Sequence, residues 1–295
     1  MRLLAFGDMH LKPSGRQIDF DRIQLPARTD AIVIAGDVVH RLGADDVEAG
    51  RRFLAALDEF GVPVLSIPGN HDPNPAHAKL TAGLENVACL HGDVYSLEDL
   101  DLLGWGCRQF DVGPELTGRS FDSLDPRDEP RERRYAADRS AERIENALFE
   151  HVTGDLSRGD LASRLEIEEG ERPHLWDQLE DFEGTYGTLE ALFSTASEPI
   201  VAVTHVPPYG TELDRHHSAG NREVDLRELH LGSIALKIAL RVHQPAVAVS
   251  GHSHNPTYES LSTGKSSTHL LNLGFRGIAT IDLSSSKGFR YNRLR

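Results

Sequence analysis

The stretch AIVIAGD, residues 31–37, is an apolar run that leads directly into a Gly-Asp pair, and it decides the fold class. The same pattern, an apolar run followed by glycine and polar residues, recurs in VPVLSIPGNHD, residues 62–72. It occurs also in Arg2–Phe6, which is followed by Gly7-Asp8. Between the first two runs, Ala44–Phe60 has apolar residues at helical spacing. Strands that alternate with helices predict a parallel sheet covered by helices, with ligands at the carboxyl ends of the strands.

The second half of the chain repeats this organisation. Pro199–His205 and Ala246–His254 are apolar runs that end in histidine, and Leu229–Val242 between them has helical spacing. The tail, His269–Arg295, is predicted to form strands joined by short turns.

The stretch from Gln109 to Ser197 differs, because it is rich in charge and its apolar residues recur at helical spacing. We predict one α/β domain made of residues 1–108 and 199–295, with residues 109–198 as a helical insertion. Both junctions should lie near the ligand edge of the sheet, so we expect the insertion to cap the cleft and to select the substrate. The alternative is a decorative or oligomerising helical layer on the far side.

The strand ends carry side chains that bind metals, in five blocks: Asp8 and His10; Asp37; Asn70 with His71; His205; His252 and His254. Alternation along a strand would point Asp8 with His10, and His252 with His254, to the same side. Carboxylate, amide and imidazole ligands suit divalent manganese, iron, zinc or nickel better than calcium. Each block alone is a weak signal, whereas five at successive strand ends are not expected by chance.

These blocks resemble a known family, the calcineurin-like metallophosphoesterases. Gly7-Asp8-Met9-His10, Gly36-Asp37, Gly69-Asn70-His71-Asp72, Thr204-His205 and Gly251-His252-Ser253-His254 are similar to its five sequence motifs. The resemblance spans residues 1–108 and 199–283, and its details look closest to the Icc-related predicted phosphoesterases. It implies a four-layer α/β/β/α sandwich with two divalent metal ions, manganese first among them.

The resemblance also implies roles for single residues. One metal would take Asp8, His10, Asp37 and His254, and the other Asp37, Asn70, His205 and His252. Asp37 would bridge the two ions, and a hydroxide between them would attack phosphorus. His71 would protonate the leaving oxygen or stabilise the transition state, and Asp72 would either orient His71 or cap the next segment.

This chain departs from the family pattern at two places, His40 after Gly36-Asp37 and Asn272-Leu273-Gly274-Phe275 near the end. Both changes bear on the shape of the substrate. His40 either reaches the substrate or lies on the surface before a helix, and the surface is the favoured interpretation. Arg276 and Arg108 either hold a phosphate or form surface ion pairs.

Composition narrows the class of protein. The net charge is −15, and only five of the 31 basic residues are lysine, which favours adaptation to high salt over the alternative of a GC-rich genome. An acidic surface does not favour nucleic acid. No apolar run is long enough for a bilayer, the apolar start stops too soon for a signal peptide, and two cysteines give no disulfide framework, so a cytoplasmic protein is expected.

The leading hypothesis is therefore an enzyme, a metal-dependent phosphodiesterase or phosphomonoesterase. A nuclease of the same architecture is the second hypothesis, and a binding module without chemistry is the third. Such a module would be expected to lose ligands, and this chain retains all of them.

Overall fold

The computed structural model describes residues 1–13, 24–107, 141–215, 230–263, 266–283 and 288–294. It contains two six-stranded sheets. The first has the order β12-β11-β1-β2-β3-β4: Phe289–Arg293, Gly277–Leu283, Arg2–Gly7, Ala31–Ile34, Val64–Ser66 and Val87–Cys89. The second has the order β5-β6-β7-β8-β10-β9: Val94–Ser96, Asp101–Trp105, Ile200–Thr204, Val247–Ser250, Ser266–Asn272 and Thr257–Thr263.

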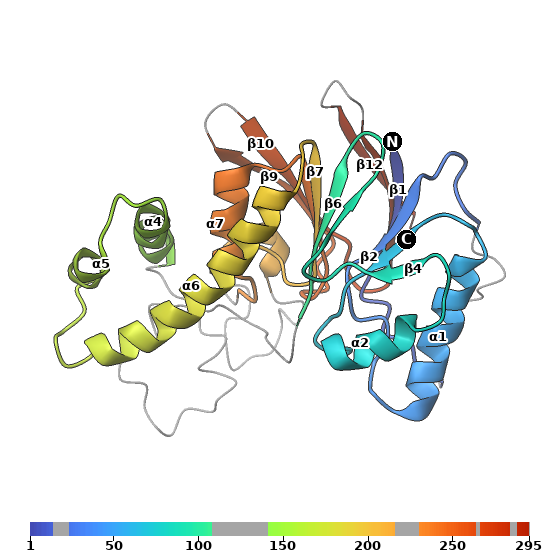
Figure 1. Ribbon diagram of the computed structural model, residues 1–295, viewed down its shortest axis with the longest axis horizontal. Coiled ribbons are helices and arrows are strands. Elements are labelled where there is room, and N and C mark those ends of the chain that lie inside the picture. The colour runs from blue at the N-terminus through green and yellow to red at the C-terminus, as the bar shows by residue number, and fades with distance from the viewer. Residues whose placement is uncertain (14–23, 108–140, 216–229, 264–265, 284–287, 295) are drawn as a thin grey trace.

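Helices cover the outer face of each sheet. On the first sheet lie α1 (Ala44–Asp58) and α2 (Asn74–Thr81), and on the second lie α6 (Arg172–Thr195) and α7 (Ile234–His243) (Figure 1). The two sheets face one another across a third apolar layer. The predicted α/β/β/α sandwich is confirmed.

Strand β1 shows why the residues are apolar on both faces. Leu4 and Phe6 pack outward with Phe53 of α1, whereas Leu3 and Ala5 pack inward against the second sheet. The Phe6 and Phe53 rings meet edge to face at 5.4 Å. A strand buried on both sides needs a continuous apolar run, which is what the sequence has.

The parallel pairs place the strand ends that carry the predicted ligands at one edge. β1 pairs with β2 and β2 with β3 in parallel, and in the second sheet β7 pairs with β8 in parallel. Gly36 follows β2 where the two sheets approach closely. Its φ is +86°, and a Cβ there would lie 2.5 Å from Nδ1 of His205, so only glycine fits.

Helix α7 begins later than predicted. The apolar spacing from Leu229 predicted a helix over 229–242, but α7 starts at Ile234, where the Ser233 hydroxyl caps it by accepting from the Leu236 N–H at 3.0 Å. The preceding His230–Gly232 segment instead bonds to Asp214. Leu229 itself lies outside the described residues.

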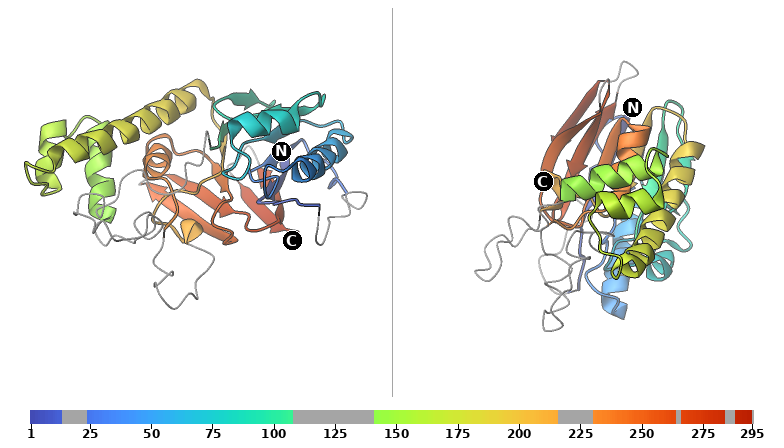
Figure 2. Two further views of the ribbon diagram at one scale, coloured as in Figure 1. Left: turned by 90° about the horizontal axis from the view of Figure 1, so that it is seen from below. Right: turned by 90° about the vertical axis from the view of Figure 1, so that its left-hand side faces the viewer.

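The described part of the predicted insertion forms α4 (Ala141–Val152), α5 (Arg158–Arg164) and all of α6. These helices share one apolar cluster with α7. In Figures 1 and 2, α4 and α5 lie beyond α6 and α7, on the side away from the second sheet. The last turns of α6, with Leu189 and Phe193, belong to the outer helical layer itself. Residues 109–140 of the predicted insertion lie outside the described residues, so the cap over the cleft stays a prediction.

A buried ion cluster joins α4 to α7. Glu145 contacts Nζ of Lys237 at 2.6 Å and the Arg241 guanidinium at 2.7 Å, and its side chain is only 9% exposed. Removing one partner of such a cluster leaves uncompensated charge beside an apolar core.

We therefore expect Glu145→Ala to lower the free energy of unfolding by about 2–4 kcal/mol, since Lys237 and Arg241 would lose their counter-ion. Urea denaturation followed by circular dichroism measures this. Arg164→Ala is the control, because it breaks an exposed pair with Glu150 and should cost under about 1 kcal/mol. Equal losses in the two variants would contradict the assignment of a stabilising role to the buried cluster.

Candidate metal centre

The seven predicted metal ligands meet at the edge where the strands end. The first sheet delivers Asp8 and His10 after β1, Asp37 after β2 and Asn70 after β3, and the second sheet delivers His205 after β7 and His252 and His254 after β8. They fall into two groups around a shared carboxylate.

In the first group, Nε2 of His10 lies 2.9 Å from Nε2 of His254. Asp8 completes it, and ligand atoms of these three residues all lie within 4.8 Å of one another. In the second group, the Asn70 Oδ1 lies 2.9 Å from Nε2 of His205 and 3.1 Å from Nδ1 of His252. Each group directs lone-pair donors at a common point.

Asp37 stands between the two groups. Its Oδ2 lies 3.5 Å from Nε2 of His10 and 3.6 Å from Nε2 of His205. Its Oδ1 accepts a hydrogen bond from the His71 N–H at 2.8 Å, which fixes the carboxylate plane. One oxygen of one carboxylate thus faces a donor from each group.

The chemistry of the donor set fits divalent cations. The buried Oδ2 of Asp8 has no hydrogen-bond partner among the described residues. The pKa of Asp8 is raised well above its ordinary value, mainly by burial and secondly by the negative charge of Asp37. Burial, then the neighbouring histidines, lowers the pKa of His10 to about 2, which keeps its imidazole neutral. A bound cation would compensate the crowded carboxylates and use the neutral imidazoles as ligands.

The backbone conformation gives another reason for the spacing of the Asp8/His10 and His252/His254 pairs than the strand alternation predicted from the sequence. Asp8, His10, Asp37, His252 and His254 all have positive φ, between 43° and 68°. Non-glycine residues rarely adopt this region, and such strain collects at functional sites. The prediction that strand alternation aligns the pairs is wrong, because both pairs lie beyond the strand ends, in tight left-handed turns.

Hydrogen bonds behind the predicted ligands orient their side chains and turns. Nδ1–H of His205 donates to the carbonyl of Ala35 at 2.8 Å, which leaves Nε2 for the centre. Asp72 accepts from the N–H of Gly69 at 2.7 Å, of Val38 at 2.8 Å and of Asp37 at 3.1 Å. Asp72 therefore neither orients His71 directly nor caps α2, but ties the Asp37 turn to the Asn70 turn.

Asp72 is wholly buried, and burial, then the charge of Asp37, raises its pKa to about 7. Asp72→Asn would turn an amide N–H₂ toward backbone N–H groups. We expect manganese affinity to fall about 10- to 100-fold, the usual effect of losing such an outer ligand support. We also expect stability to fall by about 1–3 kcal/mol. Isothermal titration with manganese and urea denaturation measure the two effects.

Asp58→Asn is the matched control for Asp72→Asn. Asp58 also accepts two backbone N–H groups, from Glu85 and Asn86, at the far end of α1. This variant should lose stability without losing manganese affinity. Loss of affinity in both variants would show that the effect is general loosening and not the connection between ligand turns.

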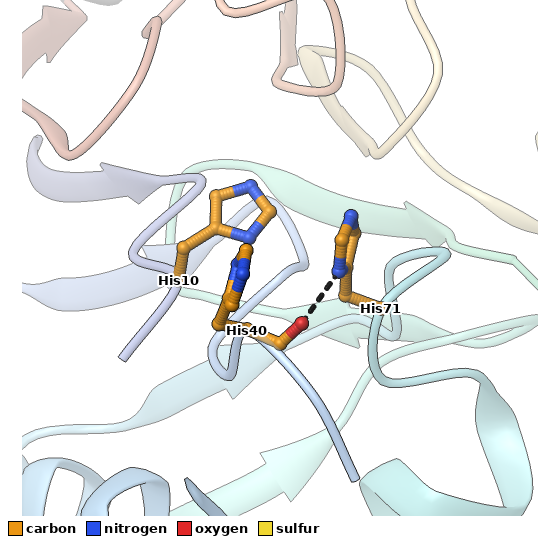
Figure 3. A group of neighbouring side chains, drawn as sticks. All are labelled: His10, His40 and His71. Carbon is orange, nitrogen blue, oxygen red and sulfur yellow. Dashed lines mark hydrogen bonds between the residues drawn. The ribbon is translucent and has the colours of Figure 1, made fainter. Parts of the chain in front are cut away.

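His71 and His40 lie beside the first group (Figure 3). Nδ1–H of His71 donates to the carbonyl of His40 at 2.7 Å, and the His71 ring meets the His10 ring edge to face at 4.6 Å. The His40 ring stacks on His71 at 5.6 Å between centroids. Burial, then His71, lowers the pKa of His40. The favoured surface interpretation of His40 is wrong, because its ring is half-buried within this cluster.

The remaining candidates have other partners. Arg276 donates from Nε to the carbonyl of Met9 at 3.0 Å, so it supports the Asp8–His10 turn. His230 bonds through Nδ1 to the buried Asp214 at 2.8 Å. Arg108 lies outside the described residues.

Comparison with known proteins establishes the family. The model of the calcineurin-like phosphoesterase family matches residues 1–256. The chain therefore belongs to the calcineurin-like phosphoesterases, hydrolases that act on phosphate esters with divalent metal ions. No curated protein matches the chain. Within the described residues, no helix combines the length and apolar character needed to cross a membrane.

Several solved structures are similar to the chain at low identity. Phosphopantetheinyl hydrolase from Mycobacterium tuberculosis is 16% identical, over 93% of this chain and 89% of its own, with a TM-score of 0.48. GAP50, the anchor in the inner membrane complex of Plasmodium, is 12% identical, over 99% and 84%, with a TM-score of 0.47. Zinc-bound Vps29 from Entamoeba histolytica is 10% identical, over 100% and 98%, with a TM-score of 0.34.

Proposed function

We propose that the protein hydrolyses phosphodiesters or phosphomonoesters at a binuclear manganese centre. The position of Asp37 carries the proposal, because its Oδ2 faces His10 of one group at 3.5 Å and His205 of the other at 3.6 Å. A shared carboxylate holds two cations roughly 3.5–4 Å apart in two-metal enzymes.

Each residue has a place in this proposal. Asp8, His10 and His254 would hold one cation, Asn70, His205 and His252 the other, and Asp37 would touch both. Two divalent cations would supply Lewis acidity to the phosphate oxygens and an acidified water at neutral pH.

His71 would act as the general acid. Its Nδ1–H is committed to the carbonyl of His40, so Nε2 is the nitrogen that can deliver a proton to the leaving oxygen. The contact between the His71 and His10 rings places it beside one metal group. His40 would fix both the tautomer and the ring position of His71 through its carbonyl and its own ring.

The test is a panel of phosphomonoesters, phosphodiesters, cyclic nucleotides and DNA, assayed after chelation and then with manganese, iron, zinc or nickel. Chelation should abolish hydrolysis and manganese should restore it best. DNA cleavage as the dominant activity would favour the nuclease, against the net charge of −15. Hydrolysis that survives complete metal removal would refute the proposal.

A further inference from the structure

Phe275 is a large apolar side chain at the rim of the metal centre. It is 51% exposed, although its ring stacks on His10 at 5.6 Å and meets His254 at 5.3 Å. Phe275 therefore lies against two residues of the first metal group and is also open to solvent.

A rigid turn holds Phe275 in this place. Residues 273–276 connect β10 of one sheet to β11 of the other, across the edge that carries the predicted ligands. The N–H of Gly274 donates to Oδ1 of Asn272 at 2.9 Å, and the N–H of Arg276 donates to the carbonyl of Asp8 at 3.0 Å. Gly274 has φ +75°, and a Cβ there would lie 2.8 Å from Pro256. The turn is thus bonded directly to a ligand-bearing loop.

The Arg276 side chain completes the support. Its guanidinium carbon lies 5.4 Å from the centre of the Phe275 ring, while its Nε donates to the carbonyl of Met9. The Phe275 ring contacts the Arg276 guanidinium and the imidazoles of His10 and His254. Because these contacts already fix the ring, binding of a ligand would cost little further conformational entropy.

We propose that Phe275 binds the organic group of the phosphate ester, and that the substrates of this centre carry an apolar, ring-shaped group next to phosphorus. This inference rests on the proposed function for its phosphate. A phosphate bound between the two metal groups would carry its ester substituent outward past His10 and His254, where the solvent-exposed part of Phe275 lies. An apolar ring placed there would remove apolar surface of both partners from water.

The experiment measures binding without turnover. Benzylphosphonate and methylphosphonate, whose carbon–phosphorus bonds an esterase does not cleave, are titrated calorimetrically into manganese-loaded protein. The wild-type protein should bind benzylphosphonate about tenfold more tightly than methylphosphonate, the size expected for one aromatic contact. Phe275→Ala should bring this ratio close to one while methylphosphonate affinity stays within about twofold. Phe275→Tyr should restore the ratio.

Tyr95→Ala is the control, because Tyr95 is 36% exposed and lies on β5, which carries no predicted ligand. It should keep the wild-type ratio. An unchanged ratio in Phe275→Ala, or no preference in the wild-type protein, would overturn the proposal. Equal weakening of both phosphonates, together with weaker manganese binding, would overturn it too, because Phe275 would then only support the metal histidines. Absence of hydrolysis in the ester panel would count against the proposed function and leave the phosphonate ratio as the separate readout.

Discussion

Asp37→Ala should remove both metal ions and abolish hydrolysis, the largest loss expected from any single change at the centre. The reason is that its Oδ2 faces both groups, so no other side chain compensates for either ion. Metal analysis after dialysis should fall from two equivalents to none, whereas Asn70→Ala should weaken one site only. Two full equivalents in the Asp37→Ala protein would exclude Asp37 as the bridging ligand.

Asp37→Asn separates folding from metal binding in this test. Its side-chain oxygen can still accept the His71 N–H that Asp37 accepts at 2.8 Å, but the negative charge is gone. The folded chain should remain, as judged by circular dichroism, while both metals are lost. Retention of the metals here would mean that geometry, and not charge, is what Asp37 contributes.

His71→Ala should retain both metals and lower kcat by about 10²–10⁴-fold, the range for a positioned general acid. The loss should be larger for an alkyl alcohol than for nitrophenol, which leaves without needing a proton. Turnover of matched alkyl and nitrophenyl esters measures this difference.

His151→Ala is the control for His71→Ala. His151 lies on α4, where it bonds to Leu156 and Glu183, and its removal should leave turnover unchanged. If His71→Ala lowers kcat equally for the alkyl and the nitrophenyl esters, His71 stabilises the phosphate charge and does not donate a proton.

Local patterns in the sequence predicted parallel strands covered by helices, with the seven candidate ligands at one edge, whereas the four-layer sandwich followed from the family resemblance. An apolar run such as 31–37 indicates a buried strand wherever it occurs, and a polar residue directly after it must lie at the strand's carboxyl end. The metal assignment of each ligand, taken from family resemblance, stays a prediction, and so does the cap formed by the insertion.

Other features depend on contacts between distant segments, which one sequence does not reveal. Asp72 looks like a helix cap, yet it bonds to Asp37 and Val38, more than thirty residues away. His40 looks like a surface residue before a helix, and only the approach of the Asn70 loop brings it onto His71. The left-handed turns at the aspartates and histidines could not be predicted from the sequence. A non-glycine residue holds this conformation where the surrounding structure imposes it.

The division of the ligands between the sheets has a consequence for stability. The first sheet supplies Asp8, His10, Asp37 and Asn70, and the second supplies His205, His252 and His254. In the proposed assignment each ion is therefore bound by residues of both sheets, so it would cross-link the two halves of the sandwich. Ions that bind the folded chain at 100 times their Kd would add about 2.7 kcal/mol per site to the free energy of unfolding. Removal of the metal ions would then lower the stability of the fold as well as abolish activity. The metal-free chain would unfold more often and would be the form that proteases degrade.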